Sequence, residues 1–110
     1  MGSSTAYRSL SVNTLKTTLA TQKGLMLLLL VSDSNGLCYL VENNLKKLPD
    51  DIKNRVAIFK MDHNTNREHL SVYFILNTPT LLFFQEGQLI DKLAGVISKN
   101  ELITKIKLYS

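Results

Sequence analysis

The chain has 110 residues, of which 45% are hydrophobic and 20% are charged, which fits a single compact domain and excludes a disordered chain. The formal net charge is +4, yet the lysines are scattered among acidic residues, so we expect a solvated surface of mixed charge and no nucleic-acid partner. The apolar run 25–31 is much shorter than the roughly 20 residues that cross a membrane, so we expect no membrane association.

We expect residues 1–110 to form one domain, apart from residues 1–6, which we interpret as disordered chain or the remnant of a tag. Cys38 is the only cysteine, so this chain forms no internal disulfide, and a reducing cytoplasm is the expected compartment. His63 and His69 have no further histidine or cysteine at metal-site spacing. We therefore expect no bound metal and no other cofactor.

The first half of the chain alternates strand and helix patterns. Residues 5–10 predict a short edge strand, and residues 11–22 predict a helix because apolar residues recur at spacings of three and four. The continuous apolar run 25–32 is typical of a strand covered on both faces in the centre of a sheet. From residue 37 the helical spacing returns until Pro49 ends it, with one predicted apolar face composed of Leu37, Leu40, Val41, Leu45 and Leu48.

The third strand is predicted at residues 55–61, and we interpret Asp62, His63 and Asn64 after it as solvated loop residues. Thr65 and Glu68 have the spacing of a capping box, which predicts a helix that reaches about residue 75. Four aromatic residues are expected in the core rather than on a surface that stacks nucleic-acid bases, namely Tyr73, Phe74, Phe83 and Phe84.

The last third of the chain predicts a hairpin and a helix. Residues 80–84 and 88–94 predict two strands, and the short Glu86-Gly87 connection requires them to be antiparallel. Ser98 and Glu101 form a second capping-box pattern before a final helix with one apolar stripe. The predicted order is β-α-β-α-β-α-β-β-α. Strand–helix–strand units give parallel neighbours and the hairpin adds an antiparallel pair, so we predict a three-layer α/β/α fold with a mixed central sheet.

This order of elements is that of the thioredoxin fold, and three segments resemble the thioredoxin family over about residues 7–108. Residues 31–38 lie where the family carries its Trp-Cys-Gly-Pro-Cys active site. Thr78-Pro79-Thr80 and the apolar residues after it resemble the family's cis-proline segment. Gly87 and the segment 95–99 resemble its terminal hairpin and the start of its last helix. The resemblance implies a thioredoxin fold for nearly the whole chain.

The departures from the family pattern concern its redox chemistry. Asn35 stands where the family has its attacking cysteine, Ser34 replaces the tryptophan before it, and Leu37 replaces a proline. The family's buried carboxylate, a proton acceptor, falls at Leu29. An amide forms no mixed disulfide, so dithiol–disulfide oxidoreductase activity is not expected. The resemblance thus implies a degenerate active-site loop that consists of Ser34, Asn35, Gly36, Leu37 and Cys38.

Cys38 matches the family's second active-site cysteine and is the one candidate catalytic thiol. Its predicted place in the first turn of a helix favours a thiolate. Its position beside Leu45, at the border of the apolar face, instead indicates partial burial, which hinders reaction. We favour an inert thiol, with Asn35 as the helix N-cap. The alternative is a residual thiol–disulfide redox protein that acts through Cys38 alone.

The Thr78-Pro79 segment indicates a second use of the fold. In the family this backbone, with a cis bond before the proline, hydrogen-bonds extended peptide substrates, and the loop before Gly95 borders the same surface. Such strand addition needs no cysteine. We therefore predict peptide- or partner-binding residues at Thr78, Pro79 and Gly95, in a redox-inactive module whose partner is a protein or an extended peptide. The identity of the partner and the oligomeric state are left open.

Overall fold

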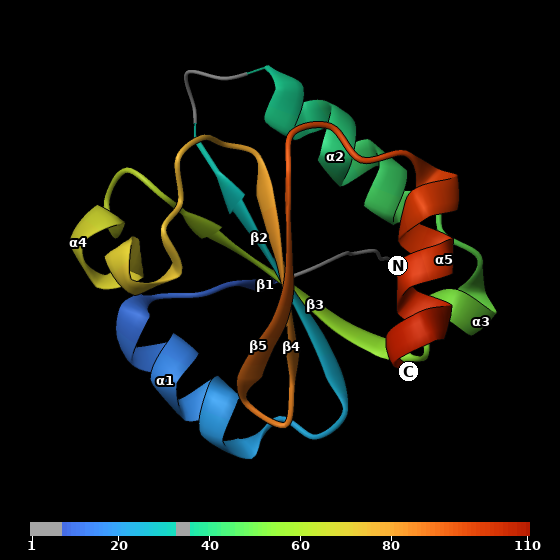
Figure 1. The fold of residues 1–110 in the computed structure, drawn as a ribbon, viewed down its shortest axis with the longest axis horizontal. Helices are drawn as coiled ribbons and strands as arrows, with labels where there is room; N and C mark the ends of the chain where they lie inside the picture. The colour runs from blue at the N-terminus through green and yellow to red at the C-terminus, as the bar shows by residue number, and fades with distance from the viewer. Residues whose placement is uncertain (1–7, 33–35) are drawn as a thin grey trace.

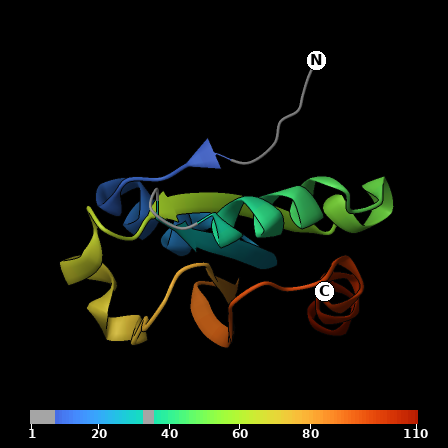
Figure 2. The same cartoon turned by 90° about the horizontal axis from the view of Figure 1, so that it is seen from above.

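A five-stranded sheet lies between two layers of helices in the computed structural model, which describes residues 8–32 and 36–110 (Figure 1, Figure 2). Helices α1 and α4 cover one face of the sheet, and α2, α3 and α5 cover the other, which confirms the predicted three-layer arrangement. The elements in chain order are β1 (Arg8–Ser9), α1 (Val12–Thr21), β2 (Leu25–Val31), α2 (Leu37–Lys46), α3 (Asp50–Lys53), β3 (Val56–Asp62), α4 (Arg67–Leu70), the 3₁₀ turn η2 (Ser71–Tyr73), β4 (Thr80–Gln85), β5 (Gln88–Ala94) and α5 (Lys99–Tyr109).

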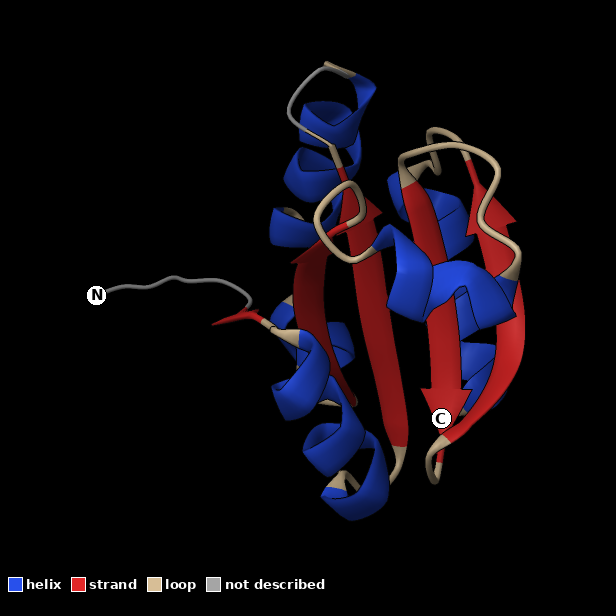
Figure 3. Cartoon of the chain, turned by 90° about the vertical axis from the view of Figure 1, so that its left-hand side faces the viewer, coloured by secondary structure: helices blue, strands red, loops and turns tan. Residues whose placement is uncertain are grey.

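The strand order across the sheet is β1-β3-β2-β4-β5. β3 pairs in parallel with both β1 and β2, whereas β4 pairs antiparallel with β2 and with β5. The mixed sheet predicted from the connections is therefore present. Figure 3 looks onto this sheet from the side of α1 and α4. The short helix α3, between α2 and β3, was not expected; it begins after Pro49 and is anchored by the buried Ile52.

β2 lies in the middle of the sheet and is buried on both faces. Successive side chains of a strand point to opposite faces, so its residues divide between two cores. The leucines at 25, 27 and 29 pack against α2, α3 and α5, while Met26, Leu28 and Leu30 pack against α1 and α4. Residues 25–30 are each at most 3% exposed. This division explains why the apolar run of β2 is continuous rather than alternating.

The apolar face of α2 is narrower than predicted. Its buried stripe runs through Cys38, Val41 and Leu45, whereas Leu37 and Leu40 are 48% and 46% exposed. Consecutive helical residues are separated by about 100° around the axis, so Leu40 lies well away from the stripe that faces the sheet. The prediction that Leu37 and Leu40 belong to the core face is wrong.

The helix predicted after Thr65 is much shorter than expected. α4 covers only Arg67–Leu70, and after η2 the backbone of Phe74 is left-handed (φ 55°), which ends the helical path. Thr65 is not the cap, because its N–H and its hydroxyl both donate to the carboxylate of Asp62, each at 2.8 Å. A charged acceptor three residues upstream holds Thr65 in a turn, so the predicted capping box does not form.

Three of the four aromatic residues that the sequence predicts in the core are buried or half-buried. Phe83 and Phe84 are buried, and the half-buried Tyr73 packs edge-on against Phe84 with ring centroids 5.6 Å apart. Phe74 is 76% exposed, so its predicted place in the core is wrong. The helix that was to carry Phe74 inward stops before this residue.

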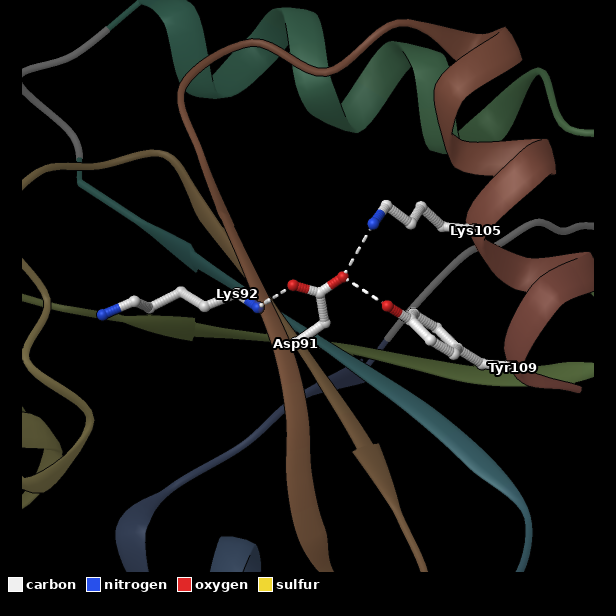
Figure 4. A network of polar contacts seen from close by, with 4 residues as sticks. All are labelled: Asp91, Lys92, Lys105 and Tyr109. Atoms are coloured by element: carbon white, nitrogen blue, oxygen red, sulfur yellow. Dashed lines mark hydrogen bonds and ion pairs between the residues drawn. The ribbon is translucent and has the colours of Figure 1, made fainter.

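α5 begins where the second capping pattern predicts. The hydroxyl of Ser98 accepts the N–H of Glu101 at 3.1 Å. At the other end of the helix, the Tyr109 hydroxyl and the Lys105 ammonium both donate to the carboxylate of Asp91 in β5, at 2.6 Å and 3.0 Å (Figure 4). This network ties the last helix to the strand at the edge of the sheet.

Candidate functional site

The segments predicted to form the site meet at one end of the sheet (Figure 1, Figure 3). β2 ends there and α2 begins there, while Pro79 precedes β4 and Gly95 follows β5. The N–H of Gly95 donates to the carbonyl oxygen of Pro79 at 2.8 Å. Gly95 has a left-handed backbone (φ 86°), which glycine adopts without strain. The structure thus brings Thr78, Pro79 and Gly95 together, and their part in binding stays a prediction.

The predicted degenerate loop is described from Gly36 onward, because Ser34 and Asn35 lie outside the described residues. Gly36 occupies the N-cap position of α2, the position predicted for Asn35. Leu37 is the first residue of the helix and is half exposed. Cys38 follows it in the first turn, as predicted, but only 5% of its surface is exposed. The thiol therefore faces the interior rather than the open end of the sheet.

Leu29, at the position of the family's buried carboxylate, is fully buried. It belongs to the core cluster that also contains Val41 and Leu45 of α2. An aliphatic side chain fills this position without the desolvation penalty of a charged group. The core beneath the start of α2 therefore holds no proton acceptor at residue 29.

The segment before β4 makes a closed turn. The peptide bond between Thr78 and Pro79 is cis. Pro79 is buried and Thr78 is half-buried. The hydroxyl of Thr80 donates to the carbonyl oxygen of Asn77 at 2.6 Å, which fixes the path of the chain as it enters the strand.

An open cavity of about 480 Å³ lies beside this turn. Its lining combines residues 75–78 with Ser32 after β2 and with His63, Asn64 and Arg67 after β3. Because β2 and β3 are parallel neighbours, the residues that follow them reach the same end of the sheet. The sequence predicts His63 and Asn64 only as loop residues. The parallel pairing of β2 and β3 is the signal that places them here.

A second cavity of about 480 Å³ lies over the ends of β1 and β3, and its lining includes Lys60, Asp62 and Thr65. The backbone N–H of Thr65, and then its hydroxyl, lower the pKa of Asp62 by donating hydrogen bonds to the carboxylate; the charge of His63 contributes less.

Among residues 8–32 and 36–110, no group of three His, Cys, Asp or Glu side chains is placed to hold a metal ion. No helix in these ranges is long and apolar enough to cross a membrane.

A mixed sheet between two helical layers, with a cysteine in the first turn of α2 and a cis proline bond at the same end, defines a thioredoxin-fold protein. The chain belongs to the thioredoxin family, whose model matches residues 7–108. A thioredoxin of Staphylococcus aureus is 31% identical over 67 residues. That match covers 61% of this chain and 64% of the relative, so it spans less than two thirds of the relative's length.

Two solved structures share the fold. A mutant thioredoxin from Halobacterium salinarum NRC-1 superimposes with a TM-score of 0.81 at 21% identity, over 94% of this chain and 88% of the other. A thioredoxin from Malassezia sympodialis, Mala s 13, gives a TM-score of 0.80 at 19% identity, over 94% and 90% of the two chains. At these identities the likeness shows the fold alone.

Proposed function

We propose that this thioredoxin-family chain is a redox-inactive module that binds a protein or an extended peptide. Reduction of a disulfide needs one thiol that attacks and a second that resolves the mixed disulfide. Cys38 is the only cysteine of the chain, and by resemblance Asn35 holds the place of the attacking cysteine. The single cysteine is the observation that carries the redox-inactive part of the proposal.

The burial of Cys38 argues against the alternative, a residual redox protein that acts through this one thiol. Formation of an intermolecular disulfide requires the sulfur of Cys38 to meet a sulfur of the partner. Glutathionylation has the same requirement for access. An exposure of 5% obstructs both reactions, so we favour binding without thiol chemistry.

The end of the sheet around Thr78 supports the binding part of the proposal. Leu76 lines the cavity there and is 90% exposed. Leu37 at the start of α2 and Val96 after Gly95 are 48% and 47% exposed. Exposed apolar side chains at one end of a sheet, one of them in the lining of an open cavity, are typical of a surface that receives another chain. The fold thus offers contacts for an extended segment that need no cysteine.

An array of immobilised, extended peptides of randomised sequence tests this surface. Leu76→Ser removes an exposed apolar side chain at the cavity, and the control Leu108→Ser removes a similarly exposed one on α5 (68%). We expect Leu76→Ser to weaken binding about fivefold, because partial burial of a leucine is worth about 1 kcal/mol. Leu108→Ser should bind like wild type. Equal binding by all three proteins places the partner on another face, and no binding by wild type contradicts the proposal.

A further inference from the structure

The cavity beside Thr78 has a cationic wall. The Arg67 guanidinium belongs to a residue of its lining, and the lining residues that the structure describes include no carboxylate. Nη2 of Arg67 donates to Oδ1 of Asn64 at 3.2 Å, and Asn64 lines the same cavity. This contact links the guanidinium to a neighbouring lining residue and leaves its other N–H groups for a second acceptor.

Of the carboxylates that the structure describes, the two nearest to Arg67 in the sequence do not neutralise this wall. Asp62 lines the second cavity and accepts both hydrogen bonds of Thr65. Glu68 is exposed and is not part of the lining. The ion pairs of residues 8–32 and 36–110 are Lys60–Glu42 and Lys105–Asp91, so Arg67 has no carboxylate partner in this part of the chain. A planar guanidinium with free donors favours a carboxylate as its acceptor.

Part of the cavity lining is apolar, and the chain that carries it is held in place. Ile75 is half-buried and Leu76 is almost fully exposed, and both line the cavity. Nζ of Lys92 in β5 donates to the carbonyl oxygens of Tyr73 and Phe74, each at 3.0 Å. A lysine on the last carbonyls of a helical turn fixes the chain that follows. An occupant of the cavity therefore meets both a positive charge and apolar side chains.

We propose that the cavity selects an acidic side chain, Asp or Glu, from an extended peptide bound at this end of the sheet. Arg67 receives the carboxylate, and Leu76 contacts an apolar neighbour of the acidic residue. This preference for an acidic residue rests on the proposed binding function, and it specifies the class of peptide that the site binds best. Because the lining residues that the structure describes include one arginine and no lysine, we expect a single acidic position rather than a preference for high net negative charge.

The test uses the randomised peptide array, followed by solution binding of a matched pair. From the sequences that bind wild type we expect one position enriched in Asp or Glu. The pair differs only there, with glutamate in one peptide and glutamine in the other. Both ends are blocked, so the glutamate side chain carries the peptide's carboxylate. Wild type should prefer the glutamate peptide about tenfold, less so at high salt.

Arg67→Gln should remove most of this preference and leave the affinity for the glutamine peptide unchanged. Arg67→Lys should retain part of it, because the charge remains but the planar fork is lost. The control Arg55→Gln removes an exposed arginine that lies outside the lining and should keep the full preference. A loss of affinity for both peptides alike indicates a structural role for Arg67 and overturns the selection.

Absence of acidic enrichment, or a preference that survives in Arg67→Gln, also overturns the acidic selection while peptide binding stands. If wild type binds no peptide of the array, the proposed function fails, and the selection fails with it. Circular dichroism of each variant checks that the fold is intact.

Discussion

In the proposed redox-inactive module, single residues account for the loss of redox chemistry while the thioredoxin fold is kept. By resemblance, Leu29 and Asn35 stand where the family has a buried proton acceptor and an attacking thiol. Without the thiol, a carboxylate at residue 29 would contribute only the penalty of burying a charge in an apolar cluster. Leu29 instead packs with Val41 and Leu45. The two replacements are therefore physically consistent. Once asparagine has replaced the attacking cysteine at residue 35, leucine is favoured over a carboxylate at residue 29.

Cys38 should behave as a buried small side chain. We expect wild type and Cys38→Ala to give the same negligible rate in an insulin-reduction assay, since no second thiol can resolve a mixed disulfide. A thiol reagent should react at least about tenfold more slowly with the native protein than with the denatured one, because the sulfur is buried. Cys38→Ala should lose about 1 kcal/mol of stability. Insulin reduction that disappears in Cys38→Ala contradicts this assignment.

At the scale of elements, Asp91 holds α5 against the edge of the sheet. Burial acts to raise the pKa of Asp91, but hydrogen bonds from Tyr109, Lys105 and the backbone N–H of Lys92 outweigh it and hold the pKa below its usual value. The same network raises the pKa of Lys105 and of Tyr109, chiefly through their hydrogen bonds to Asp91. The charged form of Asp91 is therefore part of the folded state.

A carboxyl group whose pKa is lowered on folding stabilises the protein above its unfolded pKa, near 4, and loses that contribution as the pH falls through its folded pKa. We expect Asp91→Asn to be less stable than wild type at pH 7, on the order of 1 kcal/mol. The two proteins should converge in urea unfolding as the pH is lowered below about 4. The control Asp51→Asn changes an exposed residue of α3. If the difference in free energy of unfolding between wild type and Asp91→Asn is the same at all pH values, the charge of Asp91 does not have this stabilising role.

At the scale of the whole molecule, local sequence patterns predict the sheet better than the helices around it. The continuous run of β2 and the Glu86-Gly87 hairpin are local signals that no distant contact overrides. The capping box at Thr65 fails because the carboxylate of Asp62, rather than that of Glu68, accepts the backbone N–H of Thr65, and it accepts the Thr65 hydroxyl as well. The sequence pattern alone does not predict which of two nearby carboxylates, Asp62 or Glu68, accepts the hydrogen bond.

Some residues of the candidate site could be predicted from the family resemblance, whereas others could be placed only from the pairing of the strands. Thr78 and Gly95 were found through the family resemblance, because a turn and a glycine alone do not identify a binding surface. Arg67 and His63 were missed as cavity residues. Their place depends on β3 lying parallel to β2, and the predicted helix start at Thr65 assigned this stretch of chain to ordinary helix and loop.

β2 joins two cores that have no residues in common. Leu27 packs in the cluster of α2, α3 and α5, while Leu28 packs in the cluster of α1 and α4; both are fully buried. Each leucine-to-alanine change should cost about 2–5 kcal/mol through lost burial and a residual cavity. Because the two side chains lie on opposite faces of the sheet and share no core, their costs should add.

A domain of this size has a free energy of unfolding of about 5–15 kcal/mol, so a summed loss of about 4–10 kcal/mol in Leu27→Ala with Leu28→Ala should remove a large part or all of it. Urea unfolding followed by circular dichroism measures the two single variants, the double variant and the control Leu108→Ala. The control removes an exposed leucine and should change stability by less than about 0.5 kcal/mol. A double variant whose loss falls well short of the sum shows that the cores are coupled through β2, because relaxation around one cavity then relieves the other.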